Sequence, residues 1–274
     1  MVLLIIGIIV AAIGVGLWVA KGKKEGKASL LATTDTSDVK DVNELYESMR
    51  NSVGDGSFTH FVELKGKAHS ETPLTSELSN ERVVYYKSKV VHEFKKLEEK
   101  KDSNGNIKKD WVNRKETVSE NTRWADGFGI NDDTGFIEID ATKAELHTEQ
   151  LYSNFEAAGV GDNSAMSLKI GNFSIGMGQK NPGIKTIGYR SEEHGIRMNT
   201  RIYVTGDAND RDHRLIVSKP QDSGQPFIVS VKSEEEITQQ LDSGANGMKW
   251  GAYICWGGGA GLVIAGLLKI LGVF

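Results

Sequence analysis

Residues 2–20, VLLIIGIIVAAIGVGLWVA, decide how the rest of the chain is organised, because none of them carries a charge. A bilayer core about 30 Å thick takes roughly 20 helical residues at about 1.5 Å each. The stretch therefore predicts a transmembrane helix over residues 1–20. A cleaved signal peptide is the alternative, but the apolar run exceeds the usual length, no basic segment precedes it and no clear small-residue cleavage site follows it.

A second uncharged stretch, WGAYICWGGGAGLVIAGLL, occupies residues 250–268. It is richer in glycine than the first. Trp250, Tyr253 and Trp256 suit the headgroup region at its start, and Lys269 can extend to the far interface. We expect a second transmembrane helix over residues 250–273.

Basic residues next to the two apolar stretches predict the orientation. Lys21, Lys23, Lys24 and Lys27 follow the first stretch, and Lys249 precedes the second. Loops rich in lysine and arginine stay in the cytoplasm. The region between the helices is therefore expected on the cytoplasmic side of an integral membrane protein, with both termini on the opposite side.

Small residues recur at every fourth position in both apolar stretches. Such ridges let helix backbones approach closely, and they predict packing between the two helices or between copies of the chain. The alternative is that glycine is simply common in membrane helices. The predicted ridges are Ala12, Gly16 and Ala20 in the first stretch and Gly257, Gly261 and Ala265 in the second.

The composition of the chain excludes several classes of function. Apart from Lys269, all 33 basic and 37 acidic residues lie between the apolar stretches. This acidic balance argues against general nucleic-acid binding, which depends on neutralising phosphates. Cys255 is the only cysteine, which excludes disulfides within the chain and a cysteine-based zinc site.

The middle of the chain predicts a short helix followed by strands. Residues 21–57 read as a basic linker and an amphipathic helix, with Ser37 or Asp38 as its N-cap and Gly54 as its end. Its apolar face is Val39, Val42, Leu45, Tyr46 and Met49. Residues 58–243 form the predicted soluble domain. Its expected strands cover residues 58–68, 82–94, 111–124, 136–139, 186–190, 200–205, 214–217 and 227–231.

Two further helices and two turns complete this prediction. Residues 144–157 look helical, and a helix from Ser233 is expected to carry a capping box with Glu236 and to end at Gly244. Turns are expected at 103–106 and 131–135, and residues 159–183 look irregular. The predicted fold class is α+β: a β-rich soluble domain with a few peripheral helices, flanked by two transmembrane helices.

The hairpin around residues 95–115 carries eight basic and four acidic residues. Its centre, Ser103-Asn104-Gly105-Asn106, favours a tight turn because Asn-Gly readily adopts positive φ angles. A solvated tip is the simplest interpretation. Contact with anionic lipid headgroups is the alternative, given the nearby membrane.

No residue pattern in the sequence predicts catalysis, a cofactor or a metal. The GQKNPGIKT stretch at 178–186 departs from the phosphate-binding loop, and no nucleophile elbow occurs. His92 and His194 do not fall at metal-ligand spacing. Glu192 and Glu193 are adjacent, so in a strand they point to opposite faces and cannot act as an acid/base pair. We expect the chain not to be an enzyme.

The middle domain resembles the GIDE, or beside-a-membrane, domain of mitochondrial E3 ubiquitin ligases and their prokaryotic relatives. The resemblance rests on VELKG at 62–66, DTGF at 133–136, RSEEHGIRMNTRIYVTG at 190–206 and the segments that follow. Asn199 stands where the family usually has glycine, and it can still adopt positive φ. The resemblance implies structural roles for Gly66, Pro73, Gly135, Asp140, Glu192, Glu193 and Gly206.

The resemblance also limits the expected activity. The eukaryotic ligases continue into a RING that binds two zinc ions through about eight Cys or His ligands, whereas this sequence has one cysteine. We therefore expect a RING-less relative that acts as a membrane-anchored interaction or scaffold module. The alternatives are a two-helix membrane effector and a ligase component whose RING comes from another chain. The expected partners are the bilayer, an unknown protein and a further copy of the chain.

Overall fold

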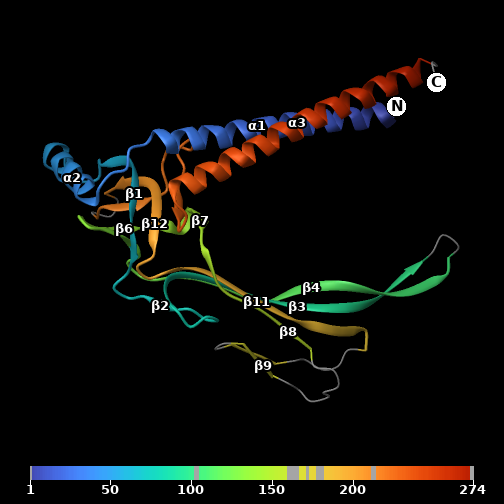
Figure 1. The fold of residues 1–274 in the computed structure, drawn as a ribbon, viewed down its shortest axis with the longest axis horizontal. Helices are drawn as coiled ribbons and strands as arrows, with labels where there is room; N and C mark the ends of the chain where they lie inside the picture. The colour runs from blue at the N-terminus through green and yellow to red at the C-terminus, as the bar shows by residue number, and fades with distance from the viewer. Residues whose placement is uncertain are drawn as a thin grey trace.

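The structure is a computed structural model that describes residues 2–101, 105–158, 167–170, 173–176, 182–210 and 214–271. Two long helices, α1 (Val2–Thr33) and α3 (Glu234–Ile270), run side by side away from a β-rich body (Figure 1). This arrangement confirms the predicted fold class. Figure 1 also shows that both chain termini lie at the far end of the helix pair.

The body nearest the helices is a closed barrel of five strands, which are β1 (Thr59–His69), β5 (Gly129–Asp132), β6 (Gly135–Ile139), β13 (Ile216–Ser218) and β12 (Arg201–Asn209). The strands pair in that order, and β12 pairs with β1 again to close the ring. Only the β6–β13 pair in this ring is parallel. Closure leaves no free edge within the ring. Two short strands, β14 (Ile228–Ser230) and β7 (Glu145–His147), extend the sheet from β12.

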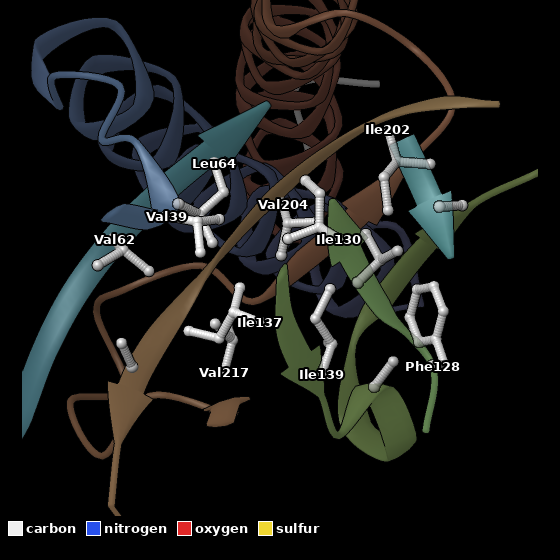
Figure 2. Packing of buried hydrophobic residues seen from close by; sticks show 14 of the residues in the cluster. Val39, Val62, Leu64, Phe128, Ile130, Ile137, Ile139, Ile202, Val204 and Val217 are labelled. Atoms are coloured by element: carbon white, nitrogen blue, oxygen red, sulfur yellow. The ribbon is translucent and has the colours of Figure 1, made fainter. Parts of the chain in front are cut away.

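The barrel interior is filled by aliphatic side chains from every strand of the ring. Figure 2 shows this cluster, in which Val62, Leu64, Ile130, Ile137 and Val204 are almost completely buried. Alternate residues of each strand point inward, as the period of two requires. Burial of side chains this large contributes roughly 1.5–3 kcal/mol each.

Helix α2 (Val39–Val53) covers the barrel with the predicted face. Val39, Val42 and Tyr46 are buried in the barrel core, whereas Leu45 and Met49 stay partly exposed. The helix ends at Gly54, whose φ of 92° suits glycine. Asp38 occupies the N-cap position but makes no side-chain cap bond.

A second sheet extends away from the barrel. It contains, in order, β2 (Leu74–Thr75), β3 (Arg82–Lys101), β11 (Ile184–Arg197) and β8 (Glu149–Ala157), and β4 (Ile107–Trp124) also pairs with β3. The β3–β4 hairpin is much longer than its predicted strands. A separate hairpin is formed by β9 (Ser167–Ile170) and β10 (Phe173–Gly176), within the stretch predicted to be irregular. The remaining short element, η1, is a 3₁₀ turn over Ala141–Lys143.

Three predictions about secondary structure are wrong. Residues 144–157 form strands β7 and β8 rather than a helix. The basic segment after residue 20 is not a linker, because α1 continues to Thr33. Gly244 does not end a short helix, because α3 runs without a break into the apolar segment. Both helices continue because each polar part packs against the other, which outweighs the low helix propensity of a single glycine.

One of the two expected turns and the expected capping box are confirmed, and the other turn lies partly outside the described residues. Strands β5 and β6 flank the turn expected at 131–135. The capping box of Ser233 and Glu236 is present at the start of α3. Residues 102–104 of the expected hairpin turn and residues 178–181 of the GQKNPGIKT stretch are not among the described residues.

Candidate functional site

The two long helices pack antiparallel along their length, and both are long and apolar enough to cross a membrane. Their contact uses small residues spaced seven apart, the repeat typical of a left-handed coiled coil. The buried positions are Gly7, Gly14 and Ala28 in α1 and Ala245, Ala252, Gly259 and Gly266 in α3.

The backbones of the two helices approach closely at Gly7 and Gly259. A Cβ atom added to Gly259 would lie 2.9 Å from the carbonyl oxygen of Gly7, and one added to Gly7 would lie 2.8 Å from the carbonyl oxygen of Gly259. Real Cβ atoms almost never come so close to a neighbour. Glycine at both positions therefore sets how closely the helices approach.

The two helices pack together, as one of the two predicted arrangements had it, but the predicted ridges do not form this contact within the chain. Gly16, Gly257 and Gly261 have open space where a Cβ would be, and Ala12 and Ala265 are exposed. Ala20 is only partly buried. Each helix carries more than one row of small residues. The row that contacts the partner helix is the one spaced seven residues apart, which includes Gly7 and Gly259.

Aromatic side chains gather where the apolar segments approach the β-rich body. The ring of Trp18 lies 5.5 Å from Trp256 and 6.0 Å from Tyr253, measured between centroids. The ammonium of Lys21 lies 4.7 Å from the centre of the Trp18 ring. Such a cluster of aromatic and basic side chains is typical of a membrane–water interface.

Beyond this aromatic cluster, both helices contact the outside of the β-rich body. Leu31 from α1, Tyr203 from β12, Ile228 from β14 and Ile237 from α3 form one buried cluster. Both helices therefore share a buried contact with β12 and β14 of the body.

A buried polar network lies next to this cluster. The carboxylate of Glu63 is completely buried, and it accepts hydrogen bonds from the Tyr203 hydroxyl at 2.7 Å and the Thr36 hydroxyl at 2.8 Å. The Lys65 ammonium lies 3.1 Å from the same carboxylate and 2.7 Å from that of Glu234 at the start of α3. The network thus joins β1, β12, α3 and the segment between α1 and α2.

The two hydrogen-bond donors of this network, Tyr203 and Lys65, both have raised pKa values. Burial raises the pKa of Tyr203, and its hydrogen bond to Glu63 raises it further, so the hydroxyl stays protonated. Burial opposes the charge of Lys65, but the hydrogen bonds to Glu234 and Glu63 outweigh it and raise the pKa of Lys65. Both groups remain fixed hydrogen-bond donors at neutral pH.

A cleft of about 550 Å³ opens beside the network. Basic side chains on β1 and β12 line one side, including Lys67 and Arg201, which lie directly opposite each other across the two strands. Like charges facing each other destabilise a strand pair. Acidic side chains of the α3 N-terminus, including Glu235 and Glu236, line another side. The cleft therefore offers both signs of charge to a partner.

The family-motif glycines lie at close contacts inside the body. A Cβ on Gly66 would lie 2.7 Å from the carbonyl oxygen of Asn131, and one on Gly206 would lie 2.9 Å from that of Ser218. At Gly135 a Cβ would lie 3.1 Å from Val39. These glycines allow the strands and α2 to pack closely.

The other motif residues are spread over the domain. Glu193 is completely buried and accepts backbone N–H bonds from residues 77, 78 and 79 of the loop before β3. Its neighbour Glu192 is only partly buried, as expected for adjacent residues of a strand. Asp140 caps the 3₁₀ turn η1, and Pro73 lies beside β2. These residues do not converge on one site.

Among the described residues, no group of three His, Cys, Asp or Glu side chains is placed to hold a metal ion. His92 stacks between Phe94 and Tyr189, with centroids 4.7 and 4.8 Å away, and lies 3.0 Å from the Thr186 hydroxyl. Burial lowers the pKa of His92, which keeps its imidazole neutral.

Two acidic residues with central roles were not identified from the sequence. Glu63 organises the polar network, and Asp132 accepts a 2.8 Å bond from the Val39 backbone N–H at the start of α2. Burial works against the charge of Asp132, but its hydrogen bonds to Thr134, Val39 and Gly135 lower its pKa. The sequence feature that could have identified Glu63 is its place between Val62 and Leu64 in a predicted strand, where an acidic residue is unexpected.

The comparisons with known proteins agree with this architecture. A family model described as GIDE, E3 ubiquitin ligase, matches residues 95–264, from the outer part of β3 to the apolar segment of α3. No curated protein and no solved structure gives a significant match to the chain. Because the matched span exceeds half of the chain, the protein belongs to the GIDE family, as its sequence resemblance predicted.

Proposed function

We propose that the protein is a membrane-anchored, non-catalytic interaction module that presents its GIDE domain on the cytoplasmic surface of a bilayer. The observation that supports this most strongly is the continuity of α1 and α3. Each helix joins an apolar segment to a polar segment without a break, and each polar segment contributes one residue, Leu31 or Ile237, to the buried cluster against the β-rich body. A domain held so firmly at a membrane is suited to recruiting a partner there.

The cleft at the start of α3 supports recognition of a protein. It lies between groups of opposite charge, and its floor includes side chains already held by hydrogen bonds. A preorganised surface loses little conformational entropy on binding. The proposed partner is a protein segment that carries both acidic and basic side chains.

Orientation and partner binding are tested separately. An impermeant maleimide should label Val53→Cys, in a Cys255→Ser background, only from the cytoplasmic side of sealed vesicles. Labelling from the other side would reject the proposed orientation. Release of the body after removal of residues 1–20 by a signal peptidase would reject double anchoring.

Chemical cross-linking in membranes, followed by purification, tests the interaction. The unaltered chain should capture a protein that Lys67→Glu combined with Arg201→Glu does not capture. The matched control is Lys40→Glu on α2, which should leave capture unchanged. If only copies of the chain itself are recovered, the recruiting function fails.

The family description favours one second candidate, a component of a ubiquitin ligase system. The RING would then come from another chain, because this sequence has one cysteine. The purified chain with a conjugating enzyme should transfer ubiquitin only after a RING protein is added. Transfer without an added RING would contradict the non-catalytic proposal.

The open face of the helix pair favours one further candidate, a membrane effector that assembles through its helices. Gly257 and Gly261 face away from α1 with open space beside them. Replacing both with leucine should then abolish assembly in the bilayer. An unchanged oligomer size, measured by cross-linking in vesicles, would remove the basis for this candidate.

A further inference from the structure

The β3–β4 hairpin is the most extended part of the body. Its strands pair from Tyr85↔Trp124 to Lys101↔Ile107. Strand β11 accompanies β3 only as far as Lys96, so the outer end of the hairpin is a ribbon of two strands. Figure 1 shows this ribbon projecting in the same general direction as the helix pair, toward the end where the termini lie.

The hairpin is long enough to reach the membrane surface. Residues 21–33, the polar part of α1, span about 20 Å at 1.5 Å per residue. Strand β3 has 20 residues, which extend over roughly 65 Å at about 3.3 Å each. The hairpin as a whole runs in the direction of the bilayer (Figure 1), and β3 is longer than the polar segment that separates bilayer and barrel. Its charged side chains exclude it from the hydrocarbon, so it meets the headgroups.

The outer part of the hairpin carries an excess of positive charge, with eight basic and three acidic residues in 95–101 and 107–115. Lys100 lies directly opposite Lys108, and Lys95 lies opposite Lys185. Three nearby acids form ion pairs with other residues, since Glu99 pairs with Lys109, Glu98 with Arg114, and Glu93 with Lys115 and Arg190, which leaves Asp110 as the other acid of the segment. Within the described part of the chain, no carboxylate forms an ion pair with Lys95, Lys96, Lys100, Lys101 or Lys108.

Exposed apolar side chains accompany these lysines. Ile107 is 60% exposed at the end of the ribbon, and Trp111 is 37% exposed. The ammonium of Lys185 lies 4.3 Å from the centre of the Trp111 ring. Lysine, tryptophan and a single aliphatic side chain are the residues that anchor a protein in the headgroup layer.

We propose that the outer part of the β3–β4 hairpin, residues 95–101 and 107–115, binds anionic headgroups of the same bilayer that α1 and α3 cross. The headgroup phosphates supply the negative charge that the facing lysines lack, and Ile107 enters the interfacial layer. This contact rests on the proposed membrane anchoring. It gives the domain a third attachment to the membrane and so fixes its orientation above the surface.

Site-directed fluorescence of the full chain in vesicles tests the contact. A polarity-sensitive probe is attached to Ile107→Cys, in a Cys255→Ser background, and headgroup-level spin-labelled lipid serves as quencher. Vesicles of phosphatidylcholine alone are compared with vesicles that also contain about one-third phosphatidylserine. We expect a blue shift and quenching in the anionic vesicles, both reversed by high salt because headgroup attraction is screened.

Removing the lysines should weaken the response in proportion. Each lysine near an anionic surface contributes about 1 kcal/mol, so the ratio of bound to free hairpin should fall about fivefold for each of Lys100→Gln, Lys101→Gln and Lys108→Gln. The matched control, Lys40→Gln with Lys143→Gln, should not change the signal. A probe at Val53→Cys on α2 should remain in water throughout.

Two results would overturn the contact. The first is a probe at residue 107 that stays as water-exposed in anionic vesicles as the probe at residue 53. The second is a response to single-stranded RNA or an acidic peptide in detergent without any response to anionic vesicles. A probe at Ile264→Cys reports separately on the helices, so loss of its bilayer signal would reject the anchoring, whereas loss at residue 107 alone would reject only the hairpin contact.

Discussion

At the scale of single residues, the buried carboxylates join parts of the fold that are distant in sequence. Glu63 and Glu193 are both completely buried. Glu63 meets Tyr203, 140 positions away, and Glu193 meets the backbone of residues 77–79, more than 110 positions away. Each carboxylate is surrounded by hydrogen-bond donors, which is the condition under which a buried charge is tolerated.

Replacing Glu193 with glutamine should destabilise the protein. The change removes the charge that three backbone N–H groups share and forces an N–H group of the amide toward the same donors. We expect a loss of about 1–3 kcal/mol in the free energy of unfolding, the range for a buried hydrogen-bonding group left unsatisfied. Thermal unfolding of the full chain in detergent, followed by circular dichroism, measures it.

Glu192→Gln is the matched control for this change. Its side chain is only partly buried on the opposite side of β11, so its melting temperature should stay close to that of the unaltered chain. Equal effects of the two substitutions would show that the hydrogen bonds to Glu193 contribute nothing specific.

Acidification should destabilise the fold through two half-buried histidines, His92 and His147. Burial lowers the pKa of His92 and of His147 below the usual value of 6.5. Above pH 6.5 both imidazoles are neutral in the folded and unfolded states. As the pH falls below 6.5 the unfolded chain takes up protons first, so stability is lost progressively until the folded-state pKa is passed.

His92→Phe isolates this effect. Phenylalanine keeps the stacking with Phe94 and Tyr189 but cannot take up a proton. The melting temperature of the variant should fall less than that of the unaltered chain between pH 7.5 and pH 5.5. Parallel curves for the two proteins over that range would contradict the contribution of His92.

The sequence predicts some residue-level features and not others, for physical reasons. Asn199 was expected to adopt positive φ, and its φ is 61°. That expectation depends on local backbone sterics alone. The roles of Glu63 and Asp132 depend on donors that only the folded chain brings near, and no local pattern records them.

At the scale of elements, the main wrong prediction is the helix over residues 144–157, which form strands β7 and β8. Leu151, Tyr152 and Phe155 have the spacing of a helix face, yet they belong to β8. This strand lies at the edge of the second sheet, and most of its residues are exposed. Without a buried face, the strand shows no alternation of apolar and polar residues, so its pairing with β11 determines the structure instead.

The helix pair also shows which feature of packing a sequence pattern cannot predict. A row of small residues predicts that helices pack, but several rows exist on each helix. Which row meets the partner depends on how the pair is fixed at its base by Leu31 and Ile237. From that base onward, the regular geometry of each helix determines which glycines face each other.

Gly259→Leu should separate the helices, whereas Gly261→Leu should not. The first side chain would collide with the backbone at Gly7, and the second would point into open space. A Cβ at residue 251 would meet only the Leu17 side chain of α1, at 3.2 Å, so in a Cys255→Ser background Leu17→Cys and Gly251→Cys should form a disulfide on mild oxidation. Gly259→Leu should sharply lower the yield of that disulfide, and gel mobility measures it.

The control and the contradictory result follow from the same geometry. Gly261→Leu should leave the disulfide yield unchanged. Equal yields with leucine at either position would show that α1 and α3 do not meet through Gly7 and Gly259.

At the scale of the whole molecule, the order of the parts could be predicted but the closure of the barrel could not. Two uncharged stretches are visible without any knowledge of contacts. The ring closes through the pairing of β1 with β12, which joins Thr59 to Asn209. A contact between residues so far apart in the sequence cannot be predicted from local periodicity. Gly66 and Gly206 nevertheless stand at positions where neighbouring strands leave no room for a side chain.

The unbroken helices should hold the body at a fixed angle to the bilayer. Gly247→Pro interrupts α3 between its polar and apolar parts, because proline removes a backbone donor and clashes with the preceding turn. A probe at Val53→Cys should then show lower fluorescence anisotropy in vesicles. Gly247→Ala, for which nothing lies within 4 Å, should leave anisotropy unchanged. Equal anisotropy for the proline and alanine variants would mean that the connection is already loose.

Because the two helices run unbroken from their apolar parts to the body, the thickness of the proposed bilayer should influence where the body lies above its surface. A bilayer thinner than the apolar segments makes transmembrane helices tilt. Over the roughly 20 Å of the polar part of α1, a tilt of about 20° displaces the base of the barrel sideways by about 7 Å. Regions of different lipid thickness would therefore present the same cleft at different places and angles, with no change in the fold of the barrel itself.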